Sequence, residues 1–215
     1  FSSQIQVLLT IDHPTLTKFY GCCNIPAKFY SEEKVYDSLY KYFPKYKNIP
    51  ELIISSTNNV NLLSSIFNLD NTDKLIVLYG IASGMSYLHE KNIVHLNLNP
   101  KNILLNYNFE PIIKIDITSR FLDKELDLFT IISEFSFFFV APELFDIDNK
   151  KQLKSCDVYS FGMICYFLLT KISTWKNNDD VQFNMMKAKN GERPKTKGII
   201  SYPFLSLIED CWNKD

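Results

Sequence analysis

Two oxygen-bearing side chains, Asn102 and Asp116, flank a pair of short apolar runs. The runs are Ile103–Leu105 and Ile112–Ile115, and the segment between them, Asn106–Pro111, is rich in turn-forming residues. This pattern predicts a β-hairpin, and antiparallel pairing would bring Asn102 and Asp116 together at its open end. A carboxamide oxygen beside a carboxylate suits Mg²⁺, which binds a few hard protein oxygens together with phosphates. The spacing therefore predicts a magnesium site.

A plainer interpretation of the same two residues stays open. Asn102 could brace a loop through hydrogen bonds to the backbone, and Asp116 could cap the turn after its strand. Neither residue would then contact a ligand. The three His and five Cys residues show no metal-ligand spacing, so no other metal centre is predicted.

Helices are predicted on both sides of the hairpin. The one before it has apolar residues at helical spacing, with Asp70, Asn71 or Thr72 as its cap. Its apolar residues are Leu75, Leu78, Ile81, Ala82, Met85 and Leu88. A later apolar run, Val158–Leu169, is shorter than the roughly 20 residues that span a bilayer. It predicts a buried helix, and no membrane segment is expected in this chain.

The composition is that of a soluble globular protein. A chain of 215 residues that is 46% hydrophobic can bury a substantial core in one domain or two lobes. A net charge of −1 gives no indication of a nucleic-acid partner. The adjacent Cys22 and Cys23 are interpreted as ordinary small apolar residues, so we expect reduced thiols and a cytoplasmic location.

Residues 93–105 read Ile-Val-His-Leu-Asn-Leu-Asn-Pro-Lys-Asn-Ile-Leu-Leu. This stretch resembles the catalytic loop of protein kinases, which combines an H-R-D-L-K-P-x-N motif with a following apolar strand. The uncharged positions fit the motif: His95, Leu98, Pro100, Asn102, Ile103 and Leu104. The charged positions do not, because Leu96 replaces the Arg, Asn97 the Asp and Asn99 the Lys.

Further matches to the same family follow in the expected order along the chain. They are Ile81–His89 (the helix before the loop), Ile112–Thr118 (a strand and an altered D-F-G triplet), Ala141–Glu143 (A-P-E), Asp157–Gly162 (D-x-x-S-x-G), Gly191–Pro194 and Cys211–Trp212. The last two resemble the tyrosine-kinase-like group. Each match is weak alone, but several in order are a strong signal.

The resemblance implies an α+β, two-lobed kinase fold with a partial N-lobe and a mostly helical C-lobe. Residues 1–57 would form the C-helix, the following strands and the hinge, and residues 58–215 the C-lobe. The Gly-rich loop and the strand Lys would lie upstream of Phe1. The Arg that pairs with Glu143 would lie beyond Asp215, so a fragment is expected.

Two replacements bear directly on phosphoryl transfer. In the family, the loop Asp accepts the proton of the attacking hydroxyl, whereas the carboxamide of Asn97 cannot. Losing such a base costs about 10²- to 10⁴-fold in rate, or about 3 to 5 kcal/mol of barrier. Asn99 also lacks the ammonium that would stabilise the transferred phosphate, which costs roughly another 10²-fold. From about 1 to 100 per second in active kinases, turnover would fall to roughly 0.01 per second or below.

The expected nucleotide site is only partly conserved. In the family, Asn102 and Asp116 bind the metal, and both are present, so ATP and Mg²⁺ are the implied cofactors. Ile54 aligns with the residue at the back of the cleft, and Ser55 and Thr57 with the hinge. Gln4 replaces the Glu of the N-lobe ion pair. Thr118 also replaces the Gly of the triplet, so both binding and loss of nucleotide agree with the sequence.

Residues 118–140 align with the activation loop. In active relatives a phosphate on this loop is bound by the Arg next to the catalytic Asp. Leu96 cannot bind phosphate, so phosphorylation would not switch this chain by that route. The aromatic run Phe135–Val140 is predicted to pack against the C-lobe rather than to form an exposed surface.

Two functional hypotheses from different classes follow, with a third that has no selected role. The first is a pseudokinase that acts in signalling by binding another kinase or a scaffold, with ATP as a further ligand. The second is a slow but active ATP-dependent Ser/Thr protein kinase. Several losses within one mechanism favour the first over the second. A decaying gene product would also show these replacements.

Overall fold

A computed structural model describes residues 8–23, 51–54, 59–115, 138–145, 153–172, 186–187 and 190–213. Its strands are β1 (Phe19–Cys23), β2 (Glu51–Ile54), β3 (Val60–Asn61), β4 (Ile103–Leu105) and β5 (Pro111–Ile113). Its helices are α3 (Leu62–Ser65), α4 (Asn71–Glu90), α6 (Leu153–Thr170) and α8 (Phe204–Cys211), with a 3₁₀ turn η4 (Pro142–Phe145). The predicted α+β class is confirmed.

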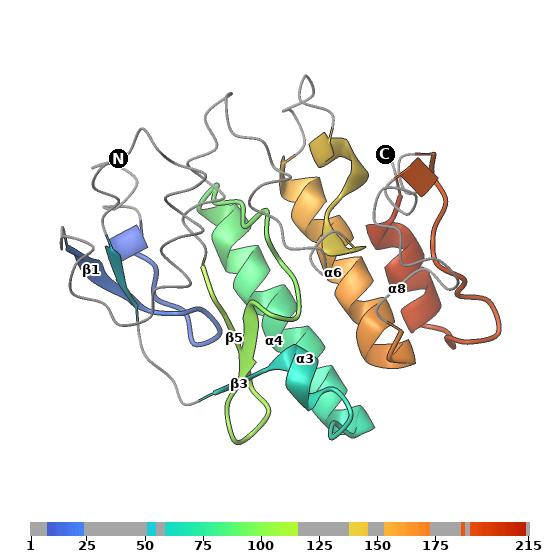
Figure 1. The fold of residues 1–215 in the computed structure, drawn as a ribbon, viewed down its shortest axis with the longest axis horizontal. Coiled ribbons are helices and arrows are strands. Elements are labelled where there is room, and N and C mark those ends of the chain that lie inside the picture. Colours follow the sequence, from blue (N-terminus) through green and yellow to red (C-terminus); the bar gives the residue numbers. More distant parts are fainter. Residues whose placement is uncertain are drawn as a thin grey trace.

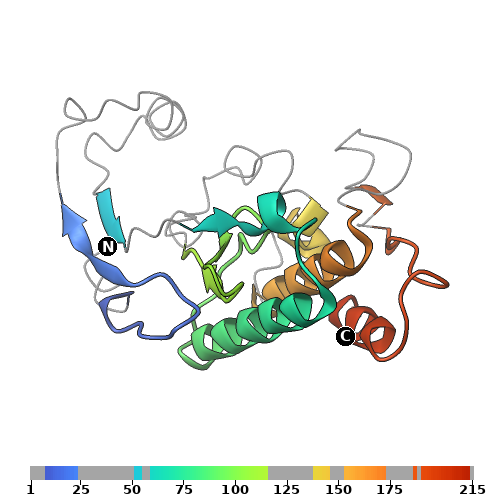
Figure 2. The same ribbon diagram turned by 90° about the horizontal axis from the view of Figure 1, so that it is seen from below.

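The strands form two small antiparallel sheets. One pairs β1 with β2, and the other has the order β3-β4-β5. Figure 1 shows the β1–β2 sheet at one end of the molecule and α8 at the other, with α4 and α6 between them. The view from below in Figure 2 shows the same succession, with the β3-β4-β5 sheet beside α4. The smaller sheet is thus set apart from the helical part.

The predicted hairpin is present as β4 and β5. Ile103 lies opposite Ile113, and Leu105 lies opposite Pro111. Beyond the last ladder pair, the N–H of Lys114 donates to the carbonyl of Asn102 at 2.8 Å. The hairpin therefore places Asn102 at its open end, as the sequence predicts. Asp116 lies outside the described residues.

Helix α4 begins at a capping box. The carboxylate of Asp70 accepts the N–H of Asp73 at 2.8 Å, and the Asp73 carboxylate accepts the N–H of Asp70 at 3.0 Å. This satisfies two backbone donors that would otherwise lack partners and selects Asp70 among the three predicted caps. Leu75 and Ala82 are exposed, although they follow the helical spacing of the buried residues.

A glycine allows an unusually close contact between α4 and the segment before β1. A Cβ at Gly84 would lie 2.5 Å from Thr15 Oγ1 and 3.1 Å from Ile113 Cδ1. Thr15 and Thr17 in turn pair with β5, since Ile113 N–H donates to Thr15 O at 2.8 Å and Thr17 N–H to Ile113 O at 2.9 Å. The N-terminal segment is thereby joined to the hairpin that carries Asn102.

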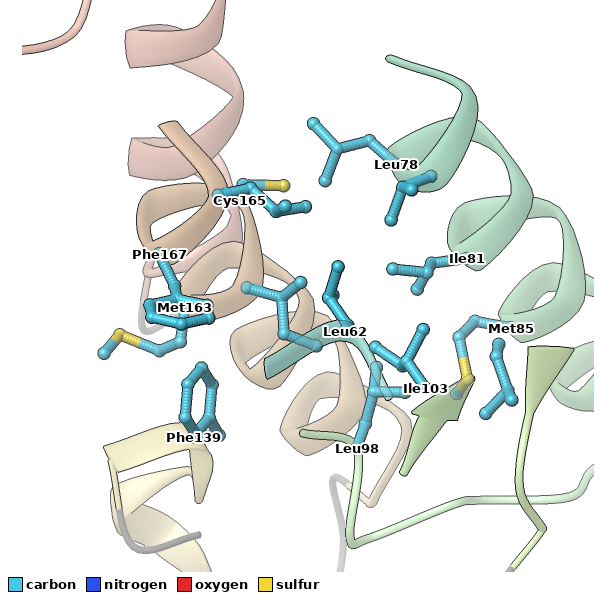
Figure 3. Close-up of a cluster of buried hydrophobic side chains, with 14 of the residues drawn as sticks. Leu62, Leu78, Ile81, Met85, Leu98, Ile103, Phe139, Met163, Cys165 and Phe167 are labelled. Carbon is cyan, nitrogen blue, oxygen red and sulfur yellow. The ribbon is translucent and has the colours of Figure 1, made fainter. Parts of the chain in front are cut away.

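The core lies between the helices and the larger sheet. In Figure 3, Leu62, Ile81 and Ile103 approach one another from α3, α4 and β4, and all three are fully buried. α6 packs against both α4 and α8. Most of its apolar run is buried, including Ile164 and Leu168, which confirms the predicted core helix. Within the described ranges, no helix has the length and apolarity required to cross a membrane.

Candidate functional site

The backbone of the loop formed by residues 93–102 is held by one buried carboxylate, that of Asp157. Asp157 Oδ2 accepts the N–H of His95 and Oδ1 accepts the N–H of Leu96, each at 2.8 Å. His89, in the last turn of α4, places its Nε2 2.9 Å from Asp157 Oδ2. Asp157 is 1% exposed, so its charge is stabilised by these bonds rather than by water.

Because Asp157 directly precedes the apolar run Val158–Leu169, the sequence predicts that it caps the N-terminus of this helix and hydrogen-bonds the loop backbone. This prediction is half wrong. Asp157 does bind the loop backbone, but it is not the N-terminal cap of its helix, because α6 begins at Leu153 and Asp157 lies beyond the first turn. The carboxylate points out of the helix to N–H groups of the loop rather than to N–H groups of α6. A cap and an interior residue have similar local sequence signals, since the difference depends on where the helix starts.

Leu96 is buried with its backbone in the left-handed region, at φ 60°. This conformation costs an L-residue about 1 to 2 kcal/mol. The bond from its N–H to Asp157 stabilises the backbone there. Its apolar side chain has no hydrogen-bond donor, so this position cannot bind a phosphate.

His95 ties the loop to the chain after β5. Its Nε2 lies 2.7 Å from the carbonyl of Lys114, and its Nδ1 accepts the N–H of Asn97 at 3.2 Å. A carbonyl can only accept and a backbone N–H can only donate, so the ring carries its proton on Nε2. The imidazole thus acts as a structural bridge here, between Asn97 and the strand end.

Three carboxamides meet at Asn97. Asn99 Nδ2 donates to Asn97 Oδ1 at 2.8 Å and to Asn97 O at 2.9 Å. Asn102 Nδ2 also donates to Asn97 O, at 2.9 Å, and Asn99 Oδ1 accepts the N–H of Lys101 at 3.0 Å. Asn99 is 2% exposed, so its side chain stays inside the loop. Asn97 and Asn99, which replace the Asp and the Lys of the family motif, are therefore hydrogen-bonded to each other.

The predicted role of Asn102 as a metal ligand stays a prediction. Because its Nδ2 donates to Asn97 O, its Oδ1 faces the other way, and the residue is half-buried. The second predicted ligand, Asp116, is outside the described residues. Among the residues that the structure describes, no group of three or more His, Cys, Asp or Glu side chains forms a metal site.

Comparison with known proteins places these features in a family. The family model described as protein tyrosine and serine/threonine kinase matches residues 1–215, the whole chain. The chain belongs to this kinase family. This membership agrees with the resemblance on which loop 93–102 is predicted to be the catalytic loop.

Similar kinases come from distant organisms. A Dictyostelium discoideum protein described as a probable serine/threonine-protein kinase is 26% identical over the whole chain. The rust resistance kinase Lr10 of Triticum aestivum is 28% identical over 83% of the chain, and mitogen-activated protein kinase kinase kinase 7 of Bos taurus is 26% identical over all of it. The chain spans 15%, 26% and 34% of the lengths of these relatives.

The remaining predicted site residues are described only in part. Ile54 ends β2, opposite Phe19 in β1, and its place at the back of the nucleotide cleft stays a prediction. Ser55, Thr57, Gln4 and Thr118 lie outside the described residues, so their expected roles stay predictions. The division into residues 1–57 and 58–215 is likewise untested.

The aromatic run at the end of residues 118–140 packs as predicted where it is described. Phe139 is 2% exposed and meets Phe167 of α6 edge to face, with ring centroids 6.0 Å apart. Its carbonyl accepts the hydroxyl of Ser160 at 2.6 Å. Phe135–Phe137, earlier in the same aromatic run, are outside the described residues.

Glu143 of the A-P-E triplet contacts a thiol. Cys156 Sγ donates to Glu143 Oε1 at 3.6 Å. Burial, together with the nearby Glu143 carboxylate, raises the pKa of the Cys156 thiol. The thiol therefore stays protonated and acts as a hydrogen-bond donor rather than as a nucleophile.

Sequence reasoning missed two contributions to the site. His89 lies four residues after buried Met85, so helical spacing alone places it on the inner face of α4. Its pairing with Asp157 depends on the crossing of α4 and α6, which no local pattern encodes. The pairing of Thr15 and Thr17 with β5 was also missed, because only two residues of the segment contribute to the ladder.

Proposed function

We propose that this kinase domain is catalytically impaired and acts in signalling by binding other proteins. The observation that carries the proposal is the 2.8 Å bond from Asn99 Nδ2 to Asn97 Oδ1. The atom at the proton-acceptor position is thereby engaged by a neighbouring donor. No carboxylate at position 97 and no ammonium at position 99 is available for phosphoryl transfer.

The intact frame of the loop supports a binding role. Asp157, His95 and Asn102 all make the bonds that hold the loop backbone. A loop that is held in a defined conformation but lacks the charged groups of phosphoryl transfer fits a domain that is selected for its surface. We propose another kinase or a scaffold protein as its partner. We also propose that this domain lies in the cytoplasm and belongs to the tyrosine-kinase-like group.

ATP and Mg²⁺ fit the described half of the site. Asn102 Oδ1 would serve as one ligand of the metal, and Asp116 would supply the carboxylate. When bound, the metal would neutralise charge on the nucleotide phosphates. Ile54, Ser55 and Thr57 would line the adenine end, as hinge residues.

A slow Ser/Thr protein kinase is the alternative. The hydrogen bonds that hold the loop backbone favour this alternative as well. A loop held in shape by Asp157 could still position a hydroxyl near a bound nucleotide, and positioning supplies much of the rate in phosphoryl transfer. Turnover would then be low but not zero.

Two measurements on the full-length protein test the proposal. Phosphotransfer from radiolabelled ATP to a generic Ser/Thr protein should remain below roughly 0.01 turnovers per second. A turnover of about 1 per second or more would contradict impairment. Thermal-shift titration with ATP, with and without Mg²⁺, should show a metal-dependent rise that Asp116→Ala removes. A rise that Asp116→Ala leaves unchanged would place the nucleotide elsewhere.

A further inference from the structure

One asparagine differs from all the others in the chain by the residue that follows it. Asn190 is followed by Gly191, whereas every other Asn precedes a residue that has a side chain. The side-chain Cγ of an Asn and the backbone nitrogen of the next residue can close a succinimide ring, and only glycine leaves that nitrogen without an adjacent Cβ. Misplacing reacting atoms by about 1 Å can cost roughly 10²-fold in rate, so an obstructing side chain slows ring closure strongly.

Both reacting groups are accessible in the fold. Asn190 is exposed and Gly191 is half-buried. Within the described ranges, neither the carboxamide of Asn190 nor the N–H of Gly191 makes a hydrogen bond. Gly191 has φ 86°, a conformation that glycine adopts without strain. The carboxamide can therefore rotate toward the nitrogen without breaking a bond of its own.

A second turn provides a comparison within the same molecule. Asn108 is also exposed and also precedes a residue of positive φ, Phe109 at 60°. Phe109 carries a Cβ, however, and its N–H donates to Asn106 O at 3.0 Å. The nitrogen that would attack Asn108 is thus both engaged and obstructed. The two sites share exposure and turn geometry, and only Asn190 also has an accessible glycine nitrogen beside it.

We propose that Asn190 is a site of spontaneous covalent modification, with water as the only reagent. The nitrogen of Gly191 attacks Cγ of Asn190 and forms the C–N bond of the ring. The bond from Cγ to Nδ2 breaks, and Nδ2 leaves as ammonia with the proton of the Gly191 N–H. Water then adds to one of the two ring carbonyls and opens the ring. The product is aspartate or isoaspartate, depending on which carbonyl reacts, and no oxidant or reductant is required.

The backbone of this turn is fixed on both sides of the reacting residues. The N–H of Asn190 donates to Met186 O and the N–H of Glu192 donates to Lys187 O, each at 3.0 Å. In isoaspartate the main chain runs through the side-chain carbon, so it becomes longer between these two bonds. Both products also add a carboxylate close to Glu192, which pairs with Lys187. The isoaspartate form cannot keep both hydrogen bonds at their present lengths.

The residue after this turn connects it to two helices. The guanidinium carbon of Arg193 lies 5.1 Å from the centre of the Tyr159 ring in α6. Its Nη2 donates to the carbonyl of Trp212, directly after α8, at 3.3 Å. A longer backbone in the turn displaces Arg193 from these two contacts. Conversion to isoaspartate therefore weakens the attachment of the turn to α6 and α8, whereas conversion to aspartate leaves the backbone length unchanged.

Mass spectrometry of the folded, full-length protein after incubation at mildly alkaline pH measures the conversion. Digestion with pepsin takes place in acid and so stops the reaction. The peptide with Asn190 should gain one mass unit and separate into two products, about tenfold or more faster than the peptide with Asn108. Incubation at mildly acidic pH should slow the gain, because the attacking nitrogen must lose its proton. Asn190→Gln, whose longer side chain does not form this ring, should show no gain.

The structural consequence has its own readout, the urea midpoint of unfolding. Incubated wild type should have a lower midpoint than fresh wild type, and the loss should grow with the isoaspartate fraction. Asn190→Gln should keep its midpoint through the same incubation. Asn190→Asp adds the charge without lengthening the backbone, so its midpoint should equal that of fresh wild type.

Either of two results would overturn the inference. One is a folded protein in which Asn190 converts no faster than Asn108, although Asn190 converts once the protein is unfolded in urea. The turn would then protect the carboxamide. The other is an incubated wild type that contains isoaspartate at position 190 and keeps the midpoint of the fresh protein, since the turn would then not depend on its backbone length.

Discussion

The carboxylate of Asp157 accepts the backbone N–H of Leu96 at 2.8 Å, across 61 positions of the chain. A residue of α6 therefore helps to fix the backbone of loop 93–102 at His95 and Leu96. Leu96 keeps its left-handed backbone although the residue is apolar. The loop is thus held in a defined conformation with Leu96, Asn97 and Asn99 at the positions where the family motif has charged residues.

Asp157→Ala should destabilise the domain by about 3 kcal/mol or more. The change leaves the N–H groups of His95 and Leu96 without their acceptors in a buried site. Urea denaturation followed by circular dichroism measures the loss. Asp210→Ala, at an exposed position of α8, is the matched control and should cost less than about 0.5 kcal/mol. Equal losses for the two variants would show that Asp157 does not hold the loop.

Gly84→Ala should destabilise the domain by about 1 to 3 kcal/mol. Alanine is favoured over glycine within a helix by about 1 kcal/mol, but the added Cβ would lie 2.5 Å from Thr15 Oγ1. Thr15→Ala in the same background should recover part of the loss. At exposed Ala82, the reverse change to Gly should cost about 1 kcal/mol. A Gly84→Ala variant more stable than the wild type would refute the close contact.

Phe139→Ala should destabilise the domain by about 3 to 5 kcal/mol, because it empties a buried site against Phe167. The neighbouring Phe138 is half-buried, and its change to Ala should cost clearly less. Denaturation midpoints of the two variants give the comparison. Similar midpoints would mean that the aromatic run does not anchor the activation segment through Phe139.

Much of the secondary structure around the candidate site was predictable from the sequence, because these elements depend on local patterns. The helix after residue 70 and the hairpin β4–β5 each follow from spacing and turn residues over about 20 positions or fewer, whereas the structure was needed to select Asp70 among the three candidate caps. The kinase motifs then located Asn97, Asn99 and Asn102 within the loop. These residues were identified by type and position alone.

What could not be predicted arises between distant segments. The contact of His89 with Asp157 needs α4 and α6 to cross at one point, and the bond between Asn99 and Asn97 needs a folded loop. The start of α6 at Leu153 moved Asp157 from the expected cap to the helix interior. Helical spacing also failed to separate exposed Leu75 from buried Leu78, since burial depends on what packs against each face.

Stability should fall as the pH rises above about 9. Burial raises the pKa of Cys211 from 9.0 to about 11, and it also raises the pKa values of Cys156 and Cys165. The folded state thus keeps thiols protonated that the unfolded chain ionises, so their contribution is complete below pH 9 and is lost toward pH 11. Cys211→Ala should reduce the fall in the free energy of unfolding between these pH values. An unchanged pH dependence would contradict this.

Under the proposed function, several cooperating losses and not one residue impair phosphoryl transfer. The most direct test is the phosphotransfer rate of the single variant Asn97→Asp in the full-length protein, with a generic Ser/Thr peptide. Restoring the carboxylate leaves position 99 without its ammonium, so the rate should stay at least about 10²-fold below that of an active kinase. A rate of about 1 per second or more would contradict the account, because one change would then have sufficed.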